Sequence, residues 1–264
     1  MNYGWRMPFL FSIVFVGVGI IIQMRMEDTA PFRRLQKASR MGEVPGRSLP
    51  LLEAFRLHPR KLMLAAGAYV STNLSFYILL TYTVSYGTSV AGLHLPRGTM
   101  LAAVLIANAL VIPIMFMAGG LSDRYGRRRL FMTGVVLTGI WTFVVFPLIE
   151  TRSFVWITTA LLIGACFNSL TYGPMAAMFA ELFSTRVRCS AVSLAYQLGA
   201  IVGGGLAPII ATGLYAKYHS NFAVSVYVAG ACVISLWCAS MLKETRGSEL
   251  DEQTASGTAA ALAG

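Results

Sequence analysis

Residues 119–129 read GGLSDRYGRRR, a short basic run where two long charge-free stretches, 98–122 and 130–149, meet. Gly126 permits a turn that residues with a Cβ disfavour, and Gly119 lets the backbone approach a neighbour closely. Asp123 lies among four arginines, and a half-buried carboxylate needs such cationic partners. The run predicts a tight turn between two helices whose charges form a latch. The alternative is a basic turn with one stray acid.

Charge-free stretches recur along the whole chain. They cover 7–24, 62–96, 98–122, 130–149, 153–180, 189–216 and 218–242. A helix needs about 20 apolar residues to cross the hydrocarbon core of a bilayer. Only 12% of the 264 residues are charged and 56% are hydrophobic, which is unlike a soluble enzyme. The alternation typical of a membrane barrel is absent. We therefore expect an all-α integral membrane protein with seven transmembrane helices.

The polar segments divide the chain into four regions. We expect a first span over 1–24, a linker over 25–61 that includes a short surface helix at 51–57, and a disordered tail over 243–264. A six-helix bundle over 62–242 lies between linker and tail. Its expected spans are 62–86, 99–122, 130–149, 154–180, 189–216 and 222–242.

The lysines and arginines predict the orientation. If the first span runs inward, 17 of the 21 lie on the inside, because cationic loops resist translocation. The amino terminus is then outside and the carboxyl terminus is cytoplasmic. The basic balance follows from topology and indicates no nucleic-acid partner. The four cysteines and three histidines have no metal-ligand spacing, so we expect neither a metal nor a cofactor.

The basic run at 119–129 resembles the signature loop of the major facilitator superfamily, Gly-x-Leu-x-Asp-Arg-x-Gly-Arg-Arg. In that family the loop occurs between helices 2 and 3 and again between helices 8 and 9. Three spans precede Asp123 and four follow it. The resemblance therefore implies helices 6–12 of a twelve-helix carrier, the carboxyl-terminal half of the fold plus helix 6, as though cut from a longer protein.

Further stretches resemble the metabolite:proton symporter branch, whose members carry organic acids such as shikimate, or proline or betaine. They lie at 4–10, 27–29, 50–67, 172–174, 180–188, 196–197 and 203–208. The sugar-porter branch is the alternative, since it shares Glu181, Arg186 and Arg188. It normally has a proline where this chain has Lys243.

Two groups of residues are candidates for function. A charged loop after the fifth span extends the expected inner gate, although its charges have the alternative of being solvated surface groups. The gate residues are Gly119, Asp123, Arg124, Gly126, Arg127, Arg128, Glu181, Arg186 and Arg188. Polar side chains inside spans usually face a cavity or a partner helix. The cavity candidates are Asn73, Tyr77, Thr81, Asn108, Asn168, Tyr172 and Gln197.

Small residues on the sixth span predict close helix packing. Ala195, Gly199 and Gly203 repeat every four residues and so lie on one helical face. Prolines at 113, 147, 174 and 208 favour kinks within the spans. Both features are expected to serve structure.

The resemblance implies a secondary active transporter, not an enzyme, in the bacterial inner membrane. It would move an organic acid by alternating access, coupled to protons. No Asp, Glu, Lys or Arg lies inside the seven spans, so proton coupling is implied by the family and would need the missing helices 1–5. A seven-helix receptor or retinal protein is the remote alternative. The last span, 218–242, lacks the lysine that a retinal protein requires.

Overall fold

The structure is a computed structural model that describes residues 6–25, 55–56, 58–90, 92–183 and 187–242. All regular elements in these ranges are helices, which confirms the all-α class. The chain divides into two units, residues 1–47 and 48–264, and each is described by itself. The linker at 26–54, most of the surface helix expected at 51–57, the tail at 243–264 and Arg186 lie outside the described residues.

The first unit contributes one apolar helix, α1, at Met7–Arg25. Nineteen residues at 1.5 Å per residue reach about 28 Å, close to the hydrocarbon thickness. Six helices of the second unit are long and apolar enough to cross a membrane, whereas the described apolar part of α1 is shorter than these. The seventh span therefore stays a prediction.

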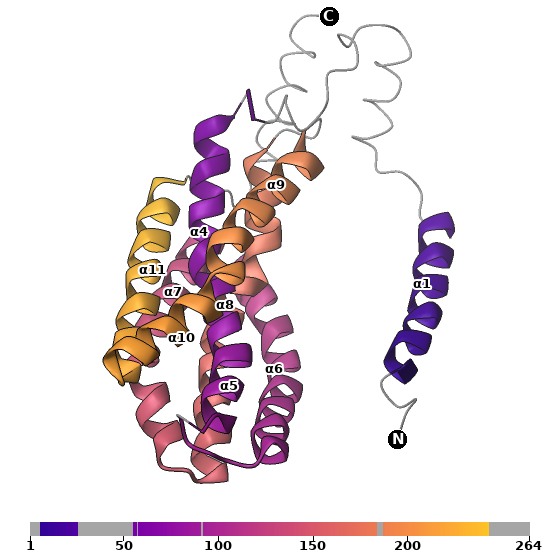
Figure 1. The fold of residues 1–264 in the computed structure, drawn as a ribbon. Helices are drawn as coiled ribbons and strands as arrows, with labels where there is room; N and C mark the ends of the chain where they lie inside the picture. The colour runs from indigo at the N-terminus through magenta and orange to yellow at the C-terminus, as the bar shows by residue number, and fades with distance from the viewer. Residues whose placement is uncertain (1–5, 26–54, 57, 91, 184–186, 243–264) are drawn as a thin grey trace, which may run out of the picture. The chain divides into compact units, whose positions relative to one another are not determined.

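The second unit is a bundle of six membrane-length helices, two of them with an interruption near the middle (Figure 1). In the first interrupted helix, α4 (Pro59–Tyr77), η2 (Ile78–Tyr82) and α5 (Thr83–Thr88) follow one another. The uninterrupted helices are α6 (Arg97–Tyr125), α7 (Arg127–Glu150), α8 (Phe154–Leu182) and α11 (Asn221–Met241). The second interrupted helix consists of α9 (Arg188–Ala200), η3 (Ile201–Gly205) and α10 (Ala207–Tyr218).

The interruptions η2 and η3 are π-helical turns, in which a backbone hydrogen bond joins residues five apart instead of the four of an α-helix. In η2 the Ile78 carbonyl accepts from the Thr83 amide and from the Thr83 hydroxyl, at 3.0 Å for the hydroxyl. The Thr83 amide provides the i→i+5 hydrogen bond of the π-turn, so this carbonyl is satisfied within the helix, as lipid requires. After η3, Pro208 lies in the first turn of α10, where a missing N–H costs nothing.

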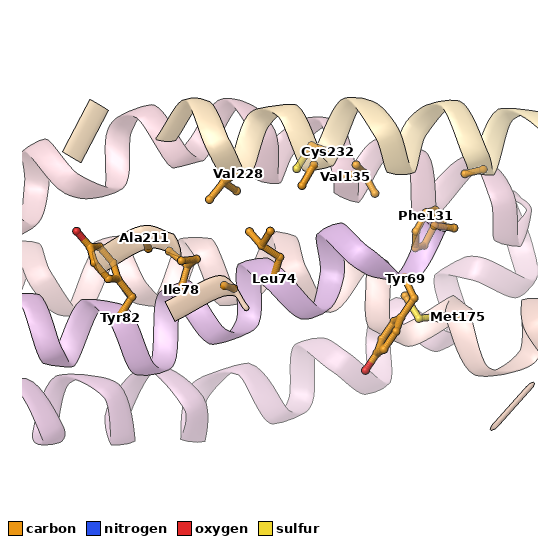
Figure 2. Close-up of a cluster of buried hydrophobic side chains, with 14 of the residues drawn as sticks. Tyr69, Leu74, Ile78, Tyr82, Phe131, Val135, Met175, Ala211, Val228 and Cys232 are labelled. Atoms are coloured by element: carbon orange, nitrogen blue, oxygen red, sulfur yellow. The ribbon is translucent and has the colours of Figure 1, made fainter. Parts of the chain in front are cut away.

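The core forms around the α4–α5 helix. Of its most apolar window, 61% is buried inside the bundle, against 22% for α6. Figure 2 shows Leu74 and Ile78 pointing toward Val228 of α11. Phe131 of α7 lies further along the same core. All four side chains are almost fully buried. The α4–α5 helix is therefore the central helix of this unit, and α6 exposes most of its surface.

The small residues on α9 and η3 lie against the backbone of α4. A Cβ on Gly199 would come within 2.7 Å of the Ala66 carbonyl oxygen, and one on Gly203 would overlap the Val70 carbonyl oxygen. Ala195 of the same face is fully buried. The expectation that this ladder permits close packing is confirmed, because neither glycine position has room for a side chain.

We predict that Gly203→Ala destabilises the bundle by about 1–3 kcal/mol, since the added methyl group meets backbone that cannot move aside. Gly213→Ala is the matched control, because its Cβ would meet nothing within 4 Å. It should be neutral or stabilising by about 0.5–1 kcal/mol through helix propensity. Unfolding by SDS titration in mixed micelles measures both. Equal stability of the two variants would contradict the packing described here.

Candidate functional site

The residues that form the turn between α6 and α7 are here called the basic turn, residues 119–129. Gly126 alone separates the two helices and has φ 98° and ψ 133°, a conformation that side chains disfavour. Its amide donates to the Ser122 carbonyl at 3.0 Å, and its carbonyl accepts from the Leu130 amide at 3.2 Å. One glycine therefore ends α6 and begins α7, and the arginines that follow it lie in the first turn of α7.

An ion pair connects the basic turn to the end of α8. Arg127 Nη1 lies 2.7 Å from Glu181 Oε1, and the two side chains are only 20% and 17% exposed. A second contact joins Arg127 Nη2 to Asp123 Oδ1 at 3.4 Å, but the Asp123 side chain is 66% exposed. Half-buried charges interact more strongly than solvated ones. Glu181 is therefore the main anionic partner of the turn.

The neighbouring arginine connects the turn to α11. Arg128 Nη2 donates to the Ser240 carbonyl at 2.6 Å, and the last carbonyls of a helix favour a cation. At the start of α9, Arg188 Nε donates to the Phe183 carbonyl at 3.4 Å. The ends of α6, α7, α8 and α11 thus meet around the basic turn. Arg124 lies exposed at the end of α6.

The reason proposed for Gly119 is wrong. A Cβ on Gly119 would meet nothing within 4 Å, whereas one on Gly173 of α8 would lie 3.0 Å from the Gly119 amide nitrogen. The close approach of α6 and α8 therefore depends on Gly173. The sequence does not show which of the two glycines needs to lack a Cβ at this contact. The direction in which each Cβ would point depends on how the two helices are rotated.

A cavity of about 320 Å³ opens among α4, η2, α6 and α8. We call it the α4–α6–α8 cavity. It contains three of the candidates, Asn108, Asn168 and Tyr172, together with Ser169. The two asparagines lie near the middle of α6 and α8, which corresponds to the middle of the membrane. Its other described lining residues are apolar: Phe76, Leu79, Leu80, Val104, Ala107, Val111, Met115, Leu161 and Ala165.

The other candidates lie elsewhere. Asn73 is buried, and its Oδ1 lies 2.8 Å from the position that a Cβ on Gly204 would occupy. The Tyr77 ring packs at the same place, and Thr81 and Gln197 are exposed. Residues 73 and 77 share a face of α4 that lies against Gly204, while the π-turn η2 at 78–82 rotates Thr81 off that face. Phe76, Leu79 and Leu80 lie in the cavity wall instead.

A second polar network lies at the far end of the bundle and was not anticipated. Tyr82 donates to Asn221 Oδ1 at 2.9 Å, and Asn221 Nδ2 donates to Glu150 Oε1 at 2.9 Å. Tyr86 also donates to Glu150 Oε1, at 3.3 Å. These four residues are the Glu150 network. The 24 residues of α7 place it about 36 Å from the basic turn. The signal available beforehand was Glu150 itself, an acid that directly follows the charge-free stretch 130–149.

The described residues contain no group of three or more His, Cys, Asp or Glu that could hold a metal ion. What they contain is an ion-paired turn at one end, a mostly apolar mid-membrane cavity, and a carboxylate network at the other end. These features define a multi-pass helical membrane protein with a mostly apolar cavity among its helices.

Comparison with known proteins agrees with this class. The model of the Major Facilitator Superfamily matches residues 1–194 and 109–263. The chain is 32% identical to the inner membrane metabolite transport protein YhjE of Escherichia coli K12, over 95% of the chain and 56% of the relative. It is 29% identical to the shikimate transporter of the same organism, over 93% and 56%. The chain belongs to the Major Facilitator Superfamily, a family of transport proteins and not of enzymes.

A third relative is the proline/betaine transporter of Escherichia coli K12, 28% identical over 96% of the chain and 51% of the relative. The chain spans about half the length of the curated relatives that it matches. The resemblance to metabolite carriers that the sequence motifs indicated is confirmed at this level.

We predict that Arg127→Gln destabilises the bundle by about 3 kcal/mol, the lower end of the range for a broken buried ion pair. The loss arises because Glu181 keeps its charge without its partner. Glu181→Gln should destabilise less, and the double variant should lose less than the sum of the two single changes. SDS titration in mixed micelles of the unchanged protein, the two single variants and the double variant gives the coupling free energy between Arg127 and Glu181.

The matched control is Arg129→Gln, which neutralises an exposed arginine two residues away. Its effect should stay within about 0.5 kcal/mol. Additive losses in the double variant, or an equal loss for Arg129→Gln, would contradict a specific Arg127–Glu181 pair.

Proposed function

We propose that the chain forms one of the two helical bundles of a secondary active transporter in a bacterial inner membrane. The transporter would move a small metabolite, an organic acid, by alternating access and in symport with protons. The observation that carries the proposal is the family match combined with a mid-membrane cavity at which helices α4, α6 and α8 meet. Carriers of this kind bind substrate near the bilayer midplane between two bundles that rock.

The basic turn fits the part of an inner gate. Its arginines connect four helix ends through the Arg127–Glu181 pair and the Arg128–Ser240 contact. Such contacts would stabilise the conformation in which the inner gate is closed, and they would be lost when the helix ends separate and the gate opens. The remaining predicted gate residues, Gly119, Asp123, Arg124, Gly126, Arg186 and Arg188, would shape the same turn and the loop beside it.

Two considerations support a second bundle. The chain covers only 56% of the length of the two matched relatives. The described lining of the α4–α6–α8 cavity contains no charged side chain, so it offers no counter-ion for an organic acid and no group that exchanges protons near pH 7. We propose that the cation and the proton-exchanging group lie in the other bundle.

Uptake measurements test this proposal. We would express the chain alone, and fused to the part of the shikimate transporter that it does not match, in cells that lack shikimate uptake. The fusion should accumulate labelled shikimate and lose that ability when a protonophore is added. Uptake by the chain alone would contradict the two-bundle proposal, and uptake insensitive to the protonophore would contradict proton symport. Immunoblots of membrane fractions control for expression.

The orientation has its own test. We expect the basic turn in the cytoplasm and the Glu150 end outside, because most lysines and arginines lie at the turn end. Arg152→Cys in a Cys189→Ser background should react with a membrane-impermeant maleimide in intact cells. The native Cys189, which is exposed at the start of α9, should react only after permeabilisation. The reverse pattern would invert the topology.

A further inference from the structure

A second pocket lies at the end of the bundle that is opposite the basic turn. We call it the Glu150 pocket. Its walls come from α5, the end of α7, the end of α10 and the start of α11, and it shares no lining residue with the α4–α6–α8 cavity. Its volume is about 300 Å³, at the lower limit for pockets that bind small molecules. A water molecule takes about 30 Å³, so the pocket has room for a small organic molecule.

The pocket contains a carboxylate that has no cationic partner in the part of the chain that the structure describes. Glu150 Oε1 accepts from the Asn221 amide at 2.9 Å and from the Tyr86 hydroxyl at 3.3 Å, and both donors are neutral. Asn221 and Tyr86 line the same pocket, so their hydrogen bonds hold the carboxylate at its wall. Glu150 is exposed, which makes it accessible to a ligand.

The other ionisable groups of this end do not cancel the charge. Arg152 and Lys217 are close to the pocket in sequence, but neither lines it. Lys217 Nζ lies 5.3 Å from the centroid of the Tyr218 ring instead. His219 lines the pocket. With the His219 imidazole neutral, the described lining residues carry a single negative charge, which attracts a cation whichever of its oxygens faces the pocket.

Aromatic rings form much of the remaining wall. The rings of Tyr86 and Tyr215 pack edge to face with centroids 5.1 Å apart, and those of Phe143 and Phe222 lie 5.8 Å apart. Aromatic rings attract organic cations and cover their apolar parts, whereas hard metal cations require several oxygen ligands. We infer that the Glu150 pocket binds the protonated amine of a small organic molecule, with its ammonium group at Glu150 and its apolar part against the rings.

Three probes of equal size test this inference: cyclohexylmethylamine, which is protonated at pH 7, cyclohexylmethanol and cyclohexanecarboxylate. Equilibrium dialysis measures their binding to the full chain in phosphatidylglycerol nanodiscs, and empty nanodiscs correct for binding to lipid. The amine should bind about 10-fold more tightly than the alcohol, because a hydrogen bond to a charged group is stronger than one between neutral groups. The carboxylate should bind most weakly. Equal binding of amine and alcohol, tightest binding of the carboxylate, or no binding of the amine would overturn the inference.

A variant pair assigns the preference to the carboxylate. Glu150→Gln removes the charge and keeps an oxygen that accepts from Tyr86 and Asn221. It should weaken binding of the amine by about 10-fold and leave binding of the alcohol unchanged. Glu150→Asp is the matched control, because it keeps the charge and should retain a preference for the amine over the alcohol. An unchanged preference in Glu150→Gln, or its complete loss in both variants, would overturn the inference.

The ammonium group has two possible sources, a soluble amine and the headgroup of phosphatidylethanolamine. The headgroup is a source because Phe143 and Phe222 of the pocket wall also expose their rings at the surface of the bundle. Nanodiscs in which phosphatidylethanolamine replaces half of the lipid are compared with nanodiscs that hold as much phosphatidylcholine, which has the same net charge and no N–H group. Weaker binding of the probe amine in the former identifies the headgroup, and equal binding identifies a soluble amine.

Discussion

The exclusion of charge from the hydrocarbon of a membrane is the constraint on which this structure depends. A charged side chain at the bilayer centre is costly, and an unsatisfied backbone group is costly as well. The chain meets the first demand by placing its charges at helix ends and the second by forming only helices in the described ranges. Even in the π-turn, the Ile78 carbonyl stays hydrogen bonded, to both the amide and the hydroxyl of Thr83.

The same constraint explains which contacts determine how the helices are arranged. Because the membrane-embedded surface is apolar, apolar packing alone does not distinguish one helix arrangement from another. In this bundle, glycines that admit a neighbouring backbone bring α9 and η3 against α4, and Gly173 brings α8 against α6. Polar contacts then connect the helix ends. The cavity has α6 as one of its walls, and α6 is the least buried of the six membrane-length helices.

Features that follow from composition and charge were predictable from the sequence. The helical class, the turn at Gly126 and the glycine ladder on α9 follow from charge-free runs, from one conformationally permissive residue and from four-residue spacing. The cavity wall was predictable only in part. Asn108, Asn168 and Tyr172 line it, whereas Asn73 and Tyr77 face Gly204 of η3 and the π-turn η2 displaces Thr81 from their face. No residue pattern announces a π-turn, so the rotation it introduces is visible only in three dimensions.

The Glu150 network was missed for a related reason. Its members come from η2, α5, α7 and α11, and each is unremarkable in its own segment. Their partnership arises when three separate chain segments meet. By contrast, Arg127 and Glu181, which form the ion pair, were both among the expected gate residues, because charges are few in this chain and lie in short loops.

The two ends of the bundle are consequently stabilised by different kinds of interaction. At the basic turn, opposite formal charges attract each other, and added salt weakens such attraction, less for a partly buried pair than for an exposed one. At the far end, Glu150 is held by the neutral donors of Asn221 and Tyr86, which salt screens little. A change in ionic strength therefore affects the contacts at the basic turn and not those at the Glu150 end. The medium that bathes the basic turn sets how firmly those helix ends stay together, while the opposite end is insensitive to it.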